Sequence, residues 1–317
     1  MHDPNVPLID LENAFNDESQ LKLLDSACRD HGFFLLKNHG MQQEIDKMWS
    51  MSEWFFSQER AEKLKLLRSE EIPLGYYDRE LTKQKRDLKE VFDFMETRQE
   101  DDINQWPKEK EFKEAMETFF NKSSNVAEKT LQLVLVCLGL DKNKYIFGDS
   151  RTSNARLNFY PVEDPLSVEE KNQANDLGDM ALHHHTDPGI LTLLLQDMTG
   201  GLQAKSKKFG WIDIVPEKDT IVVNLGDAMQ VWTNDNYIAA VHRVLKRTSK
   251  ARFSTPYFYN PQRDSLIEPL QELALSKPNY RSFTWKEYIQ GRIDDNYKDL
   301  GQDDIQISKF KINHHPA

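Results

Sequence analysis

The chain has 317 residues, of which 38% are hydrophobic and 10% aromatic, which is enough apolar material for one large core and excludes the disordered class. Its 52 acidic and 41 basic residues give a formal net charge of −11. Because an acidic surface repels phosphate backbones, we expect no nucleic-acid partner. No run reaches the roughly 18 apolar residues of a spanning helix, and the N-terminus lacks a signal-peptide pattern, so we expect a cytoplasmic protein without a membrane partner.

The two cysteines point to a reducing compartment. Cys28 lies in a helical pattern and Cys137 in an apolar run. Neither belongs to a CxxC or CxH spacing, so the sequence does not indicate a thiolate zinc site. We expect two buried thiols, which agrees with a cytoplasmic location.

The first half of the chain is predicted to be rich in helices. Val6 to Asp10 has the pattern of a short strand, and Asp17 is placed to cap a helix that ends near Asp30. The apolar run at 32–40 lies between two glycines and therefore indicates a buried strand followed by a turn. Two long helices and one strand pair complete this half, at 42–67, 112–138, 75–77 and 89–94.

From Thr152 onward, short alternating segments bounded by Gly, Pro, Asn and Asp replace the long helices. Many short strands at close spacing predict a sandwich or a rolled-up barrel. The expected strands lie at 156–161, 189–197, 200–206, 210–216, 220–232, 242–247 and 252–261. The pattern turns helical again at 266–295. We therefore predict a single domain with a helix-rich part over 1–150, a β core over 151–265 and C-terminal helices over 266–317.

A candidate metal site comes from two segments of the β core. His185 and Asp187 are two residues apart, and residues i and i+2 of a strand point to the same face. His242, expected on a later strand, supplies a third ligand. Two imidazoles and one carboxylate form the facial triad of non-haem iron(II) oxygenases. With nine histidines the HxD pair alone is a weak signal, and we expect His183 and His184 to be loop residues, with His183 a candidate pocket contact.

Two further segments suggest a site for a carboxylate. Arg252 and Ser254 are also two residues apart, and a guanidinium beside a hydroxyl suits a carboxylate ligand. Taken alone, Arg252 could equally be a surface cation. Arg156, Asn158 and Tyr160 alternate with apolar residues, so these polar side chains face a cavity if the apolar ones pack in a core. A buried polar face is costly unless it binds something, although the same face could also meet solvent.

Together these motifs resemble the isopenicillin N synthase-like branch of the Fe(II)/2-oxoglutarate oxygenases. The resemblance covers nearly the whole chain, and the order and spacing of its motifs match. It implies a mainly β fold with flanking helices, namely a distorted double-stranded β-helix or jelly roll. It also implies that His185, Asp187 and His242 bind Fe(II).

The same resemblance implies a co-substrate and a reaction. Arg252 and Ser254 would bind 2-oxoglutarate, with Asn158 and Tyr160 assisting. 2-Oxoglutarate would be decarboxylated to succinate and CO₂, with O₂ as the oxidant. The coupled outcome would be hydroxylation, desaturation or ring closure of a small-molecule metabolite. Separately, we expect the enzyme to be a monomer.

The primary substrate is expected to meet four residues. Arg156 shares a strand face with Asn158 and lies further from the Arg252–Ser254 pair, so we expect it to bind an anionic group of the substrate. Tyr77, Arg79 and Phe92 come from regions where this family builds substrate walls. For these three, core packing or a solvated loop is an equal alternative.

Four other functions stay open. An iron oxidase of the same fold, such as isopenicillin N synthase or aminocyclopropane-carboxylate oxidase, does not consume 2-oxoglutarate. An ethylene-forming type of enzyme fragments 2-oxoglutarate itself. A non-catalytic small-molecule-binding protein would be expected to have a degraded triad, which this chain does not. A zinc hydrolase would also need a well-placed general base, and none is evident.

Overall fold

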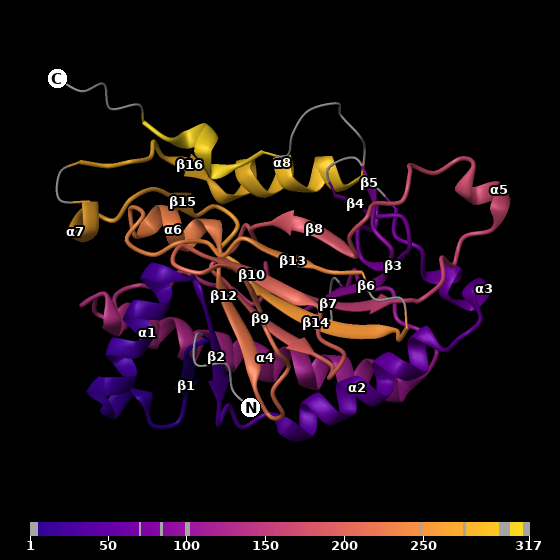
Figure 1. Ribbon diagram of the computed structural model, residues 1–317, viewed down its shortest axis with the longest axis horizontal. Helices are drawn as coiled ribbons and strands as arrows, with labels where there is room; N and C mark the ends of the chain where they lie inside the picture. The colour runs from indigo at the N-terminus through magenta and orange to yellow at the C-terminus, as the bar shows by residue number, and fades with distance from the viewer. Residues whose placement is uncertain are drawn as a thin grey trace.

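A large mixed sheet lies at the centre of the computed structural model (Figure 1). The structure describes residues 6–69, 71–82, 85–98, 102–246, 249–274, 277–297 and 305–312. Within them the large sheet has eight strands, in the order β1 (Leu8–Asp10), β2 (Phe33–Lys37), β12 (Ile221–Leu225), β9 (Leu191–Gln196), β14 (Arg252–Tyr259), β7 (Asn154–Tyr160), β6 (Glu90–Met95) and β3 (Gly75–Tyr77). Only β1 and β2 pair in parallel; the other neighbours are antiparallel.

A smaller sheet faces the large one. Its order is β11 (Gly210–Asp213), β10 (Leu202–Ser206), β13 (His242–Val244) and β8 (Leu182–His185), all antiparallel. The two sheets and their flanking helices form the jelly roll that the family resemblance implies, so this fold class is confirmed. Among the described residues, no helix combines the length and the apolar character needed to cross a membrane.

Two apolar cores explain why strands such as β9 carry apolar side chains on both faces. On β9, Leu191, Leu193 and Leu195 belong to the core that the large sheet shares with the helices. Leu194, on the opposite face of the same strand, belongs to a second core between the two sheets. Successive side chains of a strand point to opposite faces, so a strand buried on both sides needs no polar alternation.

Long helices cover the outer face of the large sheet (Figure 1). They are α1 (Glu18–Asp30), α2 (Gln42–Phe56) and α4 (Lys110–Cys137). The α1 helix begins as predicted, because the Asp17 carboxylate accepts hydrogen bonds from the backbone N–H groups of Ser19 and Gln20. Cys28 is buried and Cys137 partly buried, and neither forms a disulfide.

The remaining elements are short, except for one C-terminal helix. They are η1 (Ala14–Asn16), α3 (Arg60–Lys63), η2 (Leu64–Leu66), β4 (Leu81–Thr82), β5 (Lys85–Arg86), α5 (Val168–Lys171), α6 (Asp227–Trp232), β15 (Leu266–Ile267), α7 (Gln271–Ala274), β16 (Phe283–Thr284), α8 (Trp285–Tyr297) and η3 (Ile307–Phe310). The yellow helix α8 crosses the molecule on the side of the smaller sheet, opposite α2 and α4 (Figure 1).

Three sequence expectations need correction. The single helix expected over 42–67 ends at Phe56 and is followed by α3 and η2. The strand expected over 220–232 stops at Leu225, and α6 follows it. The helical stretch expected over 266–295 consists of two short paired strands and two helices, because β15 pairs with β16 across the intervening chain. In the last two cases distant contacts accompany the boundary, since the Asp227 backbone N–H at the start of α6 bonds to the Asp187 carbonyl and β15 pairs with β16.

Candidate metal centre and co-substrate site

Strand pairing brings the two candidate histidines together. His242 is the first residue of β13 and lies directly opposite His185, the last residue of β8. Their ring centroids are 4.3 Å apart. His183 and His184, expected in a loop, instead belong to β8. The pairing of β8 with β13 therefore places two imidazoles side by side from segments far apart in the sequence.

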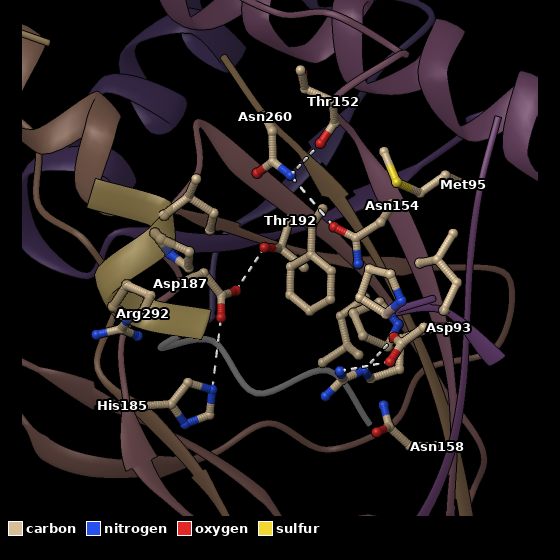
Figure 2. A pocket seen from close by; sticks show the side chains of 18 of the residues that line it. Asp93, Met95, Thr152, Asn154, Asn158, His185, Asp187, Thr192, Asn260 and Arg292 are labelled. Carbon is tan, nitrogen blue, oxygen red and sulfur yellow. Dashed lines mark hydrogen bonds and ion pairs between the residues drawn. The ribbon is translucent and has the colours of Figure 1, made fainter. Parts of the chain in front are cut away.

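Asp187 reaches the same place by a different route from the one expected. Because β8 ends at His185, Asp187 lies in the turn before β9 and not on a strand. Its Oδ2 accepts hydrogen bonds from the Thr192 hydroxyl at 2.6 Å and the Asn224 amide at 2.8 Å. Figure 2 shows Asp187 turned toward His185. Side chains of β9 and β12, and not strand parity, thus orient this carboxylate.

The donor atoms converge on one point. Asp187 Oδ1 lies 3.6 Å from His185 Nε2 and 3.8 Å from His242 Nε2, and the three atoms all lie within 4.8 Å of one another. The Nδ1–H of His185 donates to the His183 carbonyl at 2.8 Å, and that of His242 donates to the Ala240 carbonyl at 3.0 Å. A carbonyl can only accept, so each ring keeps an Nε2 lone pair directed at the shared centre.

The charge states suit a metal ligand set. Burial, together with the neighbouring His242 imidazole, lowers the pKa of His185 to about 3. Burial alone would raise the pKa of Asp187, but the two imidazoles and the hydrogen bonds from Thr192 and Asn224 outweigh it and lower that pKa. A neutral imidazole and an ionised carboxylate are the forms that bind metals. Two nitrogens and one oxygen on one side of a centre fit Fe(II) with open positions.

A close backbone approach fixes the turn that carries Asp187. A Cβ at Gly226 would lie 2.3 Å from the Gly189 carbonyl oxygen and 2.9 Å from that of Asp187. The backbone N–H of Asp227 donates to the Asp187 carbonyl at 2.8 Å. Glycine at 226 therefore lets the start of α6 pack directly against the segment between β8 and β9, residues 186–190, which we call the metal-site turn.

The candidate carboxylate site lies on β14 and β7, which are paired neighbours in the large sheet. Their register sets Arg252 opposite Tyr160 and Ser254 opposite Asn158. These four residues line the same cavity as the three candidate metal ligands, and its volume is about 1050 Å³. Arg252 is only 1% exposed; its Nε donates to the Gly200 carbonyl and its Nη1 to Ser254 Oγ, each at 3.0 Å. The guanidinium lies 5.0 Å from the centroid of the Tyr160 ring.

Of the four expected substrate contacts, the structure brings only Arg156 to the cavity wall. Phe92 is fully buried in the outer core, 4.8 Å from the Phe55 ring centroid. Arg79 binds Glu170, and the Tyr77 ring lies under Arg68 at 4.1 Å. His183 likewise does not line the cavity; it lies 3.2 Å from Asp179. We therefore correct our expectation that Tyr77, Arg79, Phe92 and His183 face the cavity.

The sequence pattern does not single out several residues that shape the site. Thr192 and Asn224 sit within apolar strands, and only the tertiary structure shows that they hold Asp187. The C-terminal helix α8 lines the cavity with Trp285, Ile289 and Arg292. The alternation of apolar and charged residues along α8 gives no sequence signal that it lies over this cavity.

Two family models match the chain. One, described as non-haem dioxygenase in morphine synthesis N-terminal, matches residues 6–109, and the 2OG-Fe(II) oxygenase superfamily model matches residues 152–261. The chain is 30% identical over 300 residues to Protein DMR6-LIKE OXYGENASE 2 of Arabidopsis thaliana, covering 90% of this chain and 82% of that protein. It is 32% identical to 1-aminocyclopropane-1-carboxylate oxidase 4 of Solanum lycopersicum, covering 90% of this chain and 89% of that protein.

Solved structures agree with the family models. The crystal structure of a full-length Neurospora crassa protein in complex with alpha-KG has a TM-score of 0.79 and 28% sequence identity, and covers 91% of this chain and 96% of that one. The same Neurospora crassa protein in complex with alpha-KG and thymine has a TM-score of 0.77 and 28% identity, covering 92% of this chain and 97% of that one.

These similarities establish that the chain belongs to the 2OG-Fe(II) oxygenase superfamily. It is a 2-oxoglutarate-dependent dioxygenase, with iron as its cofactor and 2-oxoglutarate and O₂ as co-substrates. The family and the enzyme class predicted from the sequence are thus confirmed.

Proposed function

We propose that His185, Asp187 and His242 hold one Fe(II), and that the enzyme oxidises a small-molecule metabolite while releasing succinate and CO₂. The observation that carries this proposal is the convergence of the two Nε2 atoms and Asp187 Oδ1 on one point, in a cavity of about 1050 Å³. Bound iron would activate O₂ there. The protein's own contribution is to hold the ligands in the right charge state and orientation.

We propose that Arg252 and Ser254 bind the distal carboxylate of 2-oxoglutarate, with Asn158 and Tyr160 beside it. Arg252 and Ser254 are buried and bonded to each other, so the guanidinium and the hydroxyl can meet one carboxylate together. Each hydrogen bond to a charged group of this kind contributes about 1.5–3 kcal/mol. The aromatic face of Tyr160 limits where the guanidinium can move.

The primary substrate would occupy the rest of the cavity. Arg156 lies on the same strand face as Asn158, and three of its N–H groups bind Asp93 and Glu80. A guanidinium has five N–H groups, so two can still serve a ligand. We therefore propose that Arg156 contacts an anionic group of the substrate. We also propose that the enzyme acts as a cytoplasmic monomer.

The test is succinate release by the purified chain, supplied with Fe(II), O₂ and a panel of small metabolites, with and without 2-oxoglutarate. We expect a subset of metabolites to stimulate succinate release. Arg252→Gln should abolish that release, whereas Arg29→Gln, on the surface of α1, should not. Product formation that continues unchanged without 2-oxoglutarate would contradict the proposal and indicate an iron oxidase that does not consume it, as in the 1-aminocyclopropane-1-carboxylate oxidase alternative.

A further inference from the structure

The C-terminal helix α8 touches the cavity and the metal-site turn at the same time. Trp285, Ile289 and Arg292 line the cavity. Arg292 also lies beside Asp187 and His185 in Figure 2. One helix therefore contributes both to the wall around the substrate space and to the surroundings of the candidate iron ligands.

Two sets of hydrogen bonds join α8 to Thr186, the residue between His185 and Asp187. Arg292 Nη2 donates to the Thr186 carbonyl at 2.7 Å. The side chain of Thr186 is held as well: its hydroxyl donates to Asp227 Oδ2 at 3.2 Å, and the Tyr288 hydroxyl of α8 donates to the same oxygen at 2.6 Å. The backbone and the side chain of residue 186 are thus both held by α8, directly or through Asp227.

We propose that Arg292 is a positioning residue: it fixes the peptide that joins two of the iron ligands, so that the seating of α8 over the cavity and the geometry of the iron site are set together. This inference rests on the proposed function. A bond from a charged guanidinium to a carbonyl is stronger than one between neutral groups. The Thr186 carbonyl belongs to the peptide that leads into Asp187, so rotation of this peptide would carry the Asp187 carboxylate away from His242.

The expected size of the effect follows from the behaviour of residues that orient metal ligands. Losing such an outer partner typically lowers metal affinity about 10- to 100-fold. A misplacement of about 1 Å at a reacting centre can lower the rate about 100-fold. Arg292→Ala should therefore weaken Fe(II) binding and, in turnover, raise the share of 2-oxoglutarate that is decarboxylated without substrate oxidation.

The experiment is an anaerobic Fe(II) titration of the full chain at saturating 2-oxoglutarate, followed by the charge-transfer absorption of the iron–2-oxoglutarate complex. For Arg292→Ala we expect an affinity about 10- to 100-fold lower and a shifted band. Arg292→Lys should recover most of the affinity because an ammonium can donate to the same carbonyl. Tyr288→Phe should act in the same direction but less strongly, because it leaves the bond from Arg292 to the Thr186 carbonyl in place.

Arg281→Ala is the matched control. It removes the same kind of side chain from the C-terminal region, but Arg281 does not line the cavity, and its guanidinium lies over the Phe310 ring, 4.6 Å from the centroid. We expect this variant to bind Fe(II) like the parent. If Arg292→Ala keeps the parental affinity and band, or if Arg281→Ala loses affinity to the same extent, the positioning role is overturned. If the parent chain itself binds no Fe(II), the proposed function fails first, so the two failures are distinguishable.

Discussion

Arg156 serves the fold and the cavity wall at once. Its guanidinium binds Asp93 at 2.7 and 2.9 Å and Glu80 at 2.8 Å. Both carboxylates are buried, and Lys89 and Arg68 also bind Glu80. Removing Arg156 would leave buried carboxylates short of a partner, which typically costs about 3–5 kcal/mol. Replacing Arg156 by alanine would therefore test the stability of the fold more than the binding of the substrate. A substitution that keeps the positive charge is needed.

Arg156→Lys keeps a cation between Asp93 and Glu80 but loses the forked geometry of the guanidinium. With a metabolite that stimulates succinate release, we expect the substrate KM to rise about tenfold, equivalent to about 1.4 kcal/mol, while the KM for 2-oxoglutarate changes less than about twofold. Steady-state kinetics measure both constants, and thermal unfolding checks the fold. A rise in the 2-oxoglutarate KM alone would remove Arg156 from the substrate site.

Asp187 illustrates what residue spacing can and cannot predict. The sequence identified Asp187 as a ligand candidate from its distance to His185, on the assumption that both lie on one strand. The strand ends at His185, and Asp187 is directed by Thr192 and Asn224 from β9 and β12. Those contacts are tertiary and leave no local pattern. By contrast, the alternation of residues 156, 158 and 160 correctly predicted that all three line a cavity, because strand parity is a local property.

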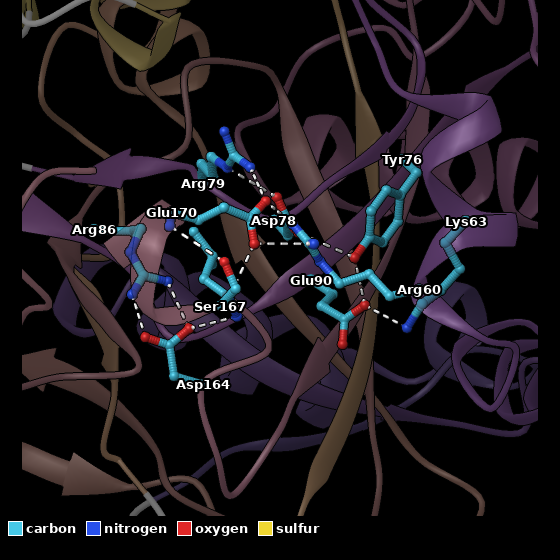
Figure 3. A network of polar contacts seen from close by, with 11 residues as sticks. Arg60, Lys63, Tyr76, Asp78, Arg79, Arg86, Glu90, Asp164, Ser167 and Glu170 are labelled. Atoms are coloured by element: carbon cyan, nitrogen blue, oxygen red, sulfur yellow. Dashed lines mark hydrogen bonds and ion pairs between the residues drawn. The ribbon is translucent and has the colours of Figure 1, made fainter. Parts of the chain in front are cut away.

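At the scale of elements, a network of ion pairs joins the segment between β7 and β8 to the N-terminal part of the chain. Glu170 of α5 binds Arg60 of α3 at 2.9 Å and Arg79 at 2.5 Å, and its carboxylate also caps α5 by accepting from the Ser167 backbone N–H (Figure 3). Arg86 binds Asp164 in the same segment. The network therefore ties the connection between the co-substrate strand and the metal strand to the N-terminal part.

This network should make stability depend on pH. The hydrogen bond from the Ser167 backbone, together with Arg60, lowers the pKa of Glu170 from 4.5 to about 2. A lowered folded-state pKa stabilises the fold above the unfolded value, and this stabilisation is lost as pH falls from about 4.5 toward 2. The Glu170 side chain is 26% exposed, so screening limits the contribution to about 1 kcal/mol.

Denaturant unfolding of the parent and of Glu170→Gln checks this prediction. We expect the parent to be more stable by about 1 kcal/mol at neutral pH, with the difference shrinking as pH approaches about 3. Glu169→Gln, at the exposed neighbouring position, should show no such pH-dependent difference. A difference that stays constant or grows on acidification would contradict the assigned role of Glu170.

Elements with strong local signals were predictable, and those fixed by distant partners were not. The Asp17 cap and the strand pair of β3 and β6 appear as expected. Almost all of the six residues of α6 are buried, so they show no helical periodicity. The sequence pattern therefore predicted that the strand β12 continues through them. The pairing of Leu266 with Thr284 interrupts a region whose composition favours helix.

At the scale of the whole molecule, the site depends on long-range register. The β8–β13 pair aligns His185 with His242, and the β7–β14 pair aligns Asn158 with Ser254. The two sheets enclose the cavity that these pairs share, and α8 lies over the metal-site turn. Iron binding would link these distant segments, so we treat the metal centre as a property of the complete fold.

The most direct test is the iron content of the chain after anaerobic reconstitution with Fe(II) and removal of free metal. Two nitrogen ligands and one carboxylate predict about one iron ion per parent chain. His242→Ala should retain almost none, whereas His184→Ala, one position from the ligand on β8, should retain the parental amount. A His242→Ala chain that keeps a full complement of iron would contradict the assignment of the metal centre.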